Sequence, residues 1–165
     1  MLSTRVVLIG FMGSGKSSVG RLLAKENKTL FLDTDAMIES SEGMTVSEIF
    51  SEKGEMYFRT LENDTVAWLK ANVNTAVISA GGGMLVYCKA LKEVGTIVYL
   101  KVPFKTILSR MTPAELEKRP LFKSPKEAEV IYNERNAIYE EQADIVINAD
   151  DTIDNVLNAL VSTTS

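Results

Sequence analysis

Gly10-Phe11-Met12-Gly13-Ser14-Gly15-Lys16-Ser17 is a complete G-x-x-x-x-G-K-[ST] phosphate-binding loop, and the apolar run at residues 6–9 leads into it as a buried strand would. Glycines in such a loop let successive backbone N–H groups curl around a phosphate without a Cβ clash. We expect Lys16 to reach the β- and γ-phosphates and the Ser17 hydroxyl to bind Mg²⁺, beside the positive dipole end of a helix that begins near Gly15. The residues expected at the nucleotide phosphates are Gly13, Ser14, Gly15, Lys16, Ser17 and Ser18. The stretch therefore predicts a nucleotide-binding protein.

Apolar, β-prone runs alternate with helical patterns along the rest of the chain. The runs lie at residues 5–9, 29–32, 76–79, 96–100 and 144–147. This rhythm predicts an α/β fold in which a mostly parallel sheet carries helices on both faces. Because 45% of the 165 residues are hydrophobic, we expect residues 1–165 to form one domain with a sizeable core.

Two of the connections are longer than a simple crossover needs. The first is predicted to contain a helical turn at 36–40, a helix at 46–51 capped by Thr45 with Glu48 in capping-box position, and a helix at about 55–71. Its part at about 34–62 is large enough to be a substrate-binding insertion. The second, at about 111–124, carries two prolines and alternating charges, which is typical of an exposed, mobile flap. We interpret it as a lid.

Ligands of open α/β sheets bind outside the carboxyl ends of the strands, so the residues at those ends belong together. The second strand ends in Asp33-Thr34-Asp35 and the third in Ser79-Ala80 followed by three glycines, 81–83. Because side chains alternate in an extended segment, we expect Asp33 and Asp35 to project to the same side while Thr34 turns away. One carboxylate could then serve a metal and the other a nucleophile. The pair could equally cap the next helix, and the glycines could form a tight turn.

The chain contains no histidine, which restricts the choice of a general base. A carboxylate must take that role near neutral pH, and Asp35 facing a substrate hydroxyl is the simplest arrangement. Four arginines lie in the insertion, in the lid or beside the lid: Arg59, Arg110, Arg119 and Arg135. Their planar guanidinium groups suit carboxylates and phosphates. Glu62 follows Arg59 by one helical turn and is expected to hold its guanidinium.

Composition narrows the partners and the compartment. A net charge of -4 leaves no basic footprint, so we expect no nucleic-acid partner. Cys88 is the only cysteine, which fits a reducing cytosol and a small buried side chain. No apolar run approaches the roughly 18 residues of a membrane span, and a first strand near Arg5 leaves no room for a targeting peptide. We therefore expect a soluble, cytoplasmic monomer that acts on small molecules.

From about Val6 to Ile147 the chain resembles the shikimate kinase family. The motifs that carry the resemblance are the phosphate loop, F-L-D-T-D at 31–35, V-S-E-I-F at 46–50, G-E-x-x-F-R-x-x-E at 54–62, the glycines at 81–83, R-P-L at 119–121, and Arg135 before Tyr139. The resemblance implies a P-loop fold like that of nucleoside-monophosphate kinases, with a five-stranded parallel sheet. It also implies ATP-dependent phosphorylation of the shikimate 3-hydroxyl, which belongs to aromatic amino-acid biosynthesis.

The same resemblance implies residue roles at the site. Asp35 would hold the substrate hydroxyls, and Asp33 would bind Mg²⁺ through water beside Ser17. Two roles involve the remaining arginines, with Arg119 at the phosphates during catalysis and Arg110 against the adenine. The residues implied at the substrate carboxylate are Arg59 and Arg135 with the glycine turn of Gly81, Gly82 and Gly83, chiefly the Gly82 backbone.

Three other classes share the phosphate loop. A gluconate or nucleoside-monophosphate kinase would share it, but the motifs at 33–35 and 54–62 resemble shikimate kinases. A GTPase switch is disfavoured because the chain lacks an Asn-Lys-x-Asp motif. A nucleotide-sensing domain without catalysis would be expected to have lost part of the polar set. That set is intact here: Lys16, Asp33, Asp35, Arg59, Arg119 and Arg135.

Overall fold

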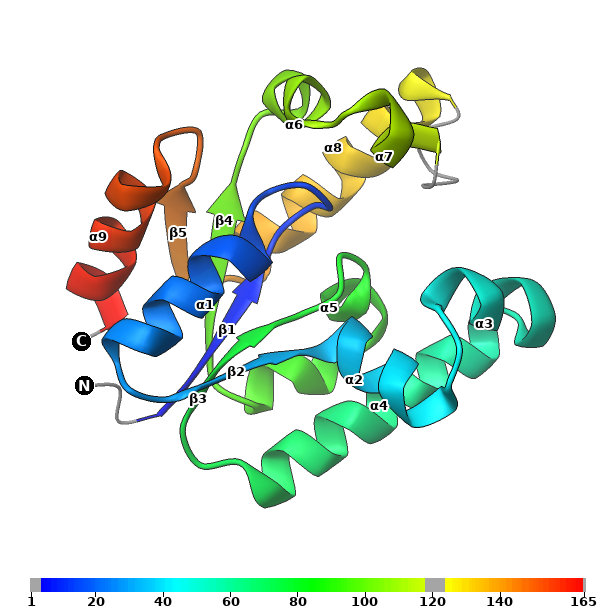
Figure 1. The fold of residues 1–165 in the computed structure, drawn as a ribbon, viewed down its shortest axis with the longest axis horizontal. Helices are drawn as coiled ribbons and strands as arrows, with labels where there is room; N and C mark the ends of the chain where they lie inside the picture. Colours follow the sequence, from blue (N-terminus) through cyan, green and yellow to red (C-terminus); the bar gives the residue numbers. More distant parts are fainter. Residues whose placement is uncertain (1–3, 118–123, 165) are drawn as a thin grey trace.

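The computed structural model describes residues 4–117 and 124–164, and within these ranges five strands form one parallel sheet (Figure 1). The strands are β1 (Arg5–Ile9), β2 (Leu30–Asp33), β3 (Ala76–Ser79), β4 (Thr96–Lys101) and β5 (Ile145–Asn148). Their order is β2-β3-β1-β4-β5, and all four pairings are parallel. The predicted strands are confirmed, with β2 and β5 starting one residue later and β2, β4 and β5 ending one residue later than expected. The order brings the ends of β1, β2 and β3 to one edge.

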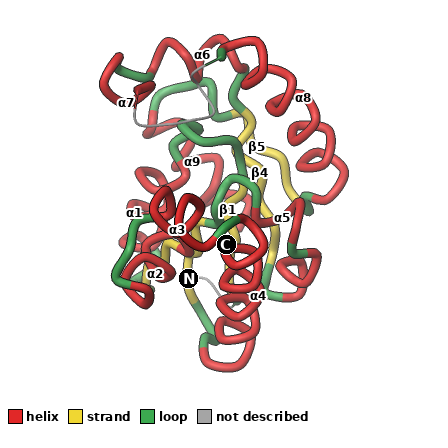
Figure 2. The backbone as a smooth tube through the Cα atoms, turned by 90° about the vertical axis from the view of Figure 1, so that its right-hand side faces the viewer, coloured by secondary structure: helices red, strands yellow, loops and turns green. Residues whose placement is uncertain are grey.

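Alternate side chains of β1, the central strand, belong to two separate hydrophobic clusters. Val6 and Leu8 pack on one face with α1 (Lys16–Glu26), α6 (Phe104–Arg110) and α9 (Ile153–Thr164). Val7 and Ile9 pack on the other with α4 (Glu55–Asn72), α5 (Met84–Tyr87) and the short η1 (Lys89–Glu93). Helix α8 (Pro125–Gln142) contributes to both clusters. Figure 2 shows the helices on both sides of the strands, as the continuous apolar runs predict.

Helices α2 (Thr34–Glu42), α3 (Val46–Lys53) and α4 fill the connection from β2 to β3. The first two are longer than predicted: α2 takes in Thr34 and ends at Glu42, before the C-cap Gly43 with a φ of 66°, and α3 continues to Lys53. The capping box is confirmed: the Glu48 N–H donates to the Thr45 hydroxyl at 3.2 Å, and the Thr45 N–H donates to the Glu48 carboxylate at 2.7 Å. A third small cluster of Ile38, Ile49 and Phe58 holds the three helices together.

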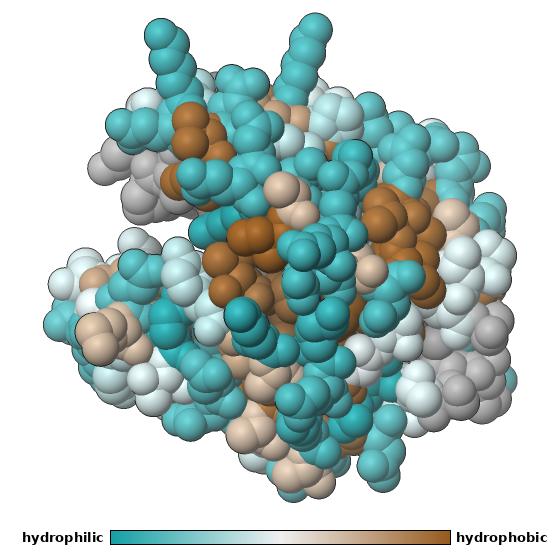
Figure 3. Space-filling model, turned by 180° about the vertical axis from the view of Figure 1, so that it is seen from behind, coloured by the Kyte–Doolittle hydropathy of each residue, from teal (hydrophilic) through white to brown (hydrophobic). Residues whose placement is uncertain are grey.

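The described part of the predicted lid is helical. Residues Pro113–Glu117 form α7, capped by Thr112, and Leu116 packs against the core. Residues 118–123 lie outside the described part of the chain. The space-filling view shows an open notch between the surface over α7 and the surface over α3 (Figure 3). Across the described ranges, no helix is long and apolar enough to cross a membrane.

Candidate active site

The phosphate loop joins β1 to α1 in a conformation that requires glycine. Gly13 and Gly15 have φ of 80° and 91°, where a side chain would be strained. The Lys16 Nζ donates to the carbonyl of Gly10 at 2.7 Å and to that of Phe11 at 3.1 Å. Ser14 Oγ is buried and has no hydrogen-bond partner among the residues that the structure describes. A buried hydroxyl without a partner in a phosphate-binding loop is suited to contact a bound phosphate oxygen.

Ser17 and Asp33 meet at the start of α1. The Ser17 hydroxyl donates to Asp33 Oδ2 at 2.9 Å, while Asp33 Oδ1 accepts from the Ala36 N–H at 3.1 Å. Asp33 therefore caps α2, which is one of the two roles that the sequence left open, and it also lies beside the phosphate loop. Within residues 4–117 and 124–164, no three His, Cys, Asp or Glu side chains form a metal cluster. A hydroxyl and one carboxylate still fit Mg²⁺, which keeps several waters and takes its other ligands from a bound nucleotide.

Asp35 lies in the first turn of α2, so the prediction of an extended segment holds for Asp33, the last residue of β2, and is wrong for Thr34 and Asp35. The helix begins at Thr34 because Asp33 caps it. Thr34 is buried, and its hydroxyl accepts from the Gly81 N–H at 3.0 Å. The Asp35 carboxylate nevertheless reaches the site, because a Cβ at Gly81 would lie 2.6 Å from its Oδ1. Helix geometry, and not strand alternation, aims Asp35 inward.

The surroundings of Asp35 favour its protonated form. Burial raises the pKa of this carboxyl from 3.8 to about 6, and the negative charge of Asp33 adds to the rise. The charges of Lys16 and, more weakly, Arg59 oppose it. A carboxylate with a pKa near the operating pH is suited to accept a proton from a hydroxyl.

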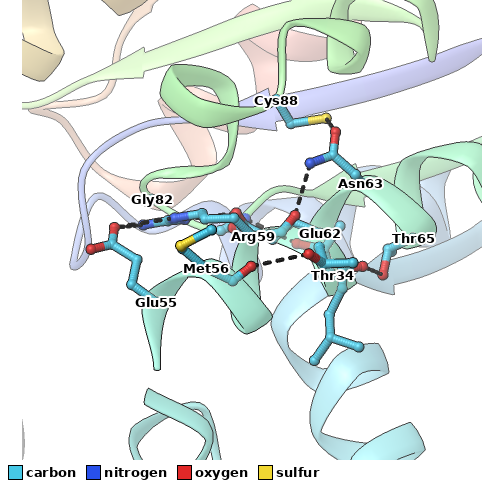
Figure 4. Close-up of polar contacts among 12 residues, drawn as sticks. Thr34, Glu55, Met56, Arg59, Glu62, Asn63, Thr65, Gly82 and Cys88 are labelled. Atoms are coloured by element: carbon cyan, nitrogen blue, oxygen red, sulfur yellow. Dashed lines mark hydrogen bonds and ion pairs between the residues drawn. The ribbon is translucent and has the colours of Figure 1, made fainter. Parts of the chain in front are cut away.

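Arg59 and Arg135 converge on the glycine turn after β3. A Cβ at Gly83 would lie 3.1 Å from Arg59 Nη2 and 3.3 Å from Arg135 Nη2. The predicted pair of Arg59 with Glu62 is confirmed, with Nη1 2.6 Å from Oε2, and Figure 4 shows Arg59 lying between Glu62 and Glu55. Burial raises the pKa of Glu62, and Arg59 opposes that rise. Two guanidinium groups beside one turn without side chains have the chemistry to bind a carboxylate.

Three contacts of this region were not predicted from the sequence. Tyr139, which the sequence marked only as part of a motif, is buried, and its hydroxyl donates a hydrogen bond to the Gly82 carbonyl. Burial raises its pKa to about 12, so it stays a donor. The Arg59 guanidinium stacks over the Tyr87 ring, 3.8 Å from the ring centroid. Glu55, in the first turn of α4, forms an ion pair with Arg59. The signal for Glu55 was available, since it precedes Arg59 by four positions in a helix.

A cavity of about 310 Å³ brings most of these groups together. Its lining residues are Met12, Gly13, Gly15, Lys16, Ser17, Ser18, Asp33, Asp35, Ser79, Ala80, Gly81 and Gly82. The two arginines lie beside it, at Gly83. Arg110 is farther along the edge, where its Nη2 donates to the Ala149 carbonyl at 3.2 Å after β5. Arg119 lies outside the described residues. The cavity can hold a polyphosphate next to a base and an anion receptor.

Comparison with known proteins identifies the family. The family model described as shikimate kinase matches residues 12–165. This chain belongs to the shikimate kinase family. A curated shikimate kinase from Helicobacter hepaticus (strain ATCC 51449 / 3B1) is 46% identical over 145 residues, which cover 88% of this chain and 86% of that protein.

Solved shikimate kinases also share the fold. The enzyme from Aquifex aeolicus vf5 superposes with a TM-score of 0.83 and 36% identity, over 96% of this chain and 95% of that one. The enzyme from Acinetobacter baumannii, solved in complex with shikimate, has a TM-score of 0.82 and 31% identity, over 97% and 94% of the two chains. A gluconokinase from Sinorhizobium meliloti 1021 shares the fold alone, with a TM-score of 0.54 and 17% identity over 99% and 94% of the chains. The predicted P-loop fold of the nucleoside-monophosphate-kinase type is confirmed.

Proposed function

We propose that this shikimate kinase family member transfers the γ-phosphoryl group of ATP to the 3-hydroxyl of shikimate, giving shikimate 3-phosphate and ADP. One observation carries the proposal: Arg59 and Arg135 converge at Gly83 while Asp35 lies against Gly81, so an anion receptor and a base flank one turn beside the phosphate loop. A ring that bears a carboxylate and hydroxyl groups matches this pairing. An acceptor without a carboxylate would make no charged contact with these two guanidinium groups.

The residues on the acceptor side bind the substrate carboxylate and accept the hydroxyl proton. Arg59 and Arg135, with the backbone of Gly81, Gly82 and Gly83, orient the substrate carboxylate, which fixes the 3-hydroxyl beside Asp35. Asp35 accepts the hydroxyl proton as the bond from this oxygen to the γ-phosphorus forms. The bond to the bridging oxygen breaks and leaves its electron pair on ADP.

The nucleotide side stabilises charge. The loop of Gly13, Ser14, Gly15, Ser17 and Ser18 donates N–H groups to the phosphates, and Lys16 neutralises the charge that develops at the γ-phosphate. Ser17, and Asp33 through water, would hold Mg²⁺, which when bound would supply positive charge that stabilises the phosphates. Arg110, next to Ala149, flanks the adenine, and Arg119 contacts the phosphates from the lid.

We extend the proposal to the domain organisation, the oligomeric state and the compartment of the protein. Residues 1–165 act as one kinase domain, with the insertion at about 34–62 holding the acceptor and the segment at about 111–124 acting as a lid. We also propose a cytoplasmic monomer that uses no nucleic acid, supported by the net charge of -4 and by a single cysteine that is free and buried.

A coupled ADP-release assay tests the acceptor. With Mg²⁺ and ATP, we expect shikimate to be phosphorylated faster than gluconate or any nucleoside monophosphate, with the product identified by mass spectrometry. The Lys16→Ala variant serves as the inactive reference, since loss of one such charge-stabilising group costs about 10²- to 10³-fold in kcat. Faster turnover of gluconate or of a nucleoside monophosphate would overturn the proposal.

A further inference from the structure

Arg59 is held by two carboxylates that differ sharply in exposure. Glu62 contacts Nη1 at 2.6 Å with a side chain that is only 2% exposed. Glu55 contacts Nη2 at 3.2 Å and Nε at 3.4 Å with a side chain that is 53% exposed. Glu62 is thus a fixed partner, while Glu55 can exchange its contact for water at little cost, because exposed pairs one turn apart on a helix contribute little.

The donor that Glu55 uses is the one nearest the proposed carboxylate site. Arg59 Nη2 would be 3.1 Å from a Cβ at Gly83, closer than Nη1 at 3.3 Å. A substrate carboxylate that contacts Nη2 at this turn shares it with Glu55, which places three negative groups around one guanidinium. Like charges at such distances repel each other, and the repulsion opposes binding.

The Glu55 side chain has open space beside it into which it can move away from Arg59. A second cavity, of about 400 Å³, lies between α4 and Tyr87 of α5. Its lining residues are Glu55, Met56, Arg59, Thr60, Asn63 and Tyr87. This cavity gives the Glu55 carboxylate room to rotate away from Arg59, while stacking on Tyr87 and the Glu62 pair keep the guanidinium in place.

We propose that Glu55 is an exchangeable internal competitor that occupies Arg59 until the substrate carboxylate takes its place, and so weakens shikimate binding. The inference rests on the proposed function, because it concerns the same carboxylate site. Its consequence for specificity is that an anion must gain contacts elsewhere in the site, as a shikimate ring does at Asp35, to outcompete Glu55.

The test is the affinity of shikimate for the full chain without nucleotide, measured by isothermal titration calorimetry for the wild type and for Glu55→Gln. We expect the variant to bind shikimate about two- to fivefold more tightly, with the difference shrinking at high salt. Shikimate methyl ester, which lacks the charge, should bind both proteins equally. The exposed Glu52→Gln, with the same charge change at the end of α3, should match the wild type.

The opposite results are equally clear. Weaker or unchanged binding of shikimate to Glu55→Gln would overturn the proposal, and weaker binding would show instead that Glu55 positions Arg59. An equal gain for the methyl ester would also overturn it, because the effect would then not involve the carboxylate. If the wild type phosphorylates shikimate, these results leave the proposed function intact. A wild type that neither binds nor phosphorylates shikimate would overturn both.

Discussion

The Ser17 hydroxyl donates to the Asp33 carboxylate at 2.9 Å, which joins the start of α1 to the end of β2. The other oxygen of Asp33 caps α2, and Asp35 lies in the first turn of that helix. The proposed metal ligand thereby also fixes the backbone that carries the proposed base. Replacing Asp33 with Asn should remove the charge and keep the cap, because Asn caps a helix about as well as Asp.

Asp33 and Asp35 are expected to respond differently to Mg²⁺. Asp33→Asn should keep α2 capped and raise the Mg²⁺ concentration needed for half-maximal activity, because a charged ligand is lost. Asp35→Asn should lower kcat by about 10²- to 10⁴-fold at any Mg²⁺ concentration, because it removes the proton acceptor. Titrating Mg²⁺ against both variants at saturating ATP and shikimate checks this. Rescue of Asp35→Asn by Mg²⁺, with Asp33→Asn indifferent to it, would reverse the two roles.

Activity should fall on the acid side of neutrality. Asp35 accepts a proton only when ionised, and its pKa is raised to about 6, chiefly by burial. The value of kcat/KM for shikimate should therefore drop as pH decreases through about 6, by roughly tenfold per unit below it. In Asp33→Asn the acid limb should move to lower pH, because one cause of the rise is gone. Rate profiles, with NMR titration of the Asp35 carboxyl in the free protein, measure both. A limb near the ordinary 3.8 would contradict the assignment.

Lysine should replace Arg59 poorly. Arg59→Lys exchanges a planar group that serves Glu62 and Gly83 together for a single point charge. Loss of one charged hydrogen bond predicts a rise in the shikimate KM of about ten- to a hundredfold, with the ATP KM nearly unchanged. The matched control is Arg21→Lys on α1, because the Arg21 guanidinium lies over the Phe31 ring of β2, away from the proposed substrate site. Weaker ATP binding with intact shikimate affinity would refute the pocket assignment.

Two glycines of one turn should give different kinetic defects when each becomes alanine. A Cβ at Gly81 would meet Asp35 Oδ1 at 2.6 Å, so Gly81→Ala should displace the base and lower kcat. A Cβ at Gly83 would crowd Arg59 and Arg135 at 3.1 and 3.3 Å, so Gly83→Ala should mainly raise the shikimate KM. Gly82→Ala should have the smallest effect, since its nearest contact would be an ordinary 3.6 Å. Steady-state kinetics of the three variants decide the matter, and identical defects would count against the division of roles.

Local patterns accounted for much of the fold and for part of the candidate site. The phosphate loop, the five strands and the capping box of Thr45 and Glu48 were predicted, because each depends on residues within a few positions of one another. The Arg59–Glu62 pair was predicted for the same reason, as the two residues are one helical turn apart.

Contacts between distant segments required the packed chain. Nothing local to Arg135 indicates that α8 delivers it to the same glycine as Arg59 on α4, or that Tyr139 reaches the Gly82 carbonyl. Asp35 is the residue whose local structure the sequence predicted wrongly. An extended strand and the first turn of a helix would both direct its side chain to the cavity. The sequence pattern favoured the strand, whereas Asp35 lies in the helix. The choice depended on Asp33 capping α2 while accepting from Ser17, and that double contact exists only once α1 packs beside β2.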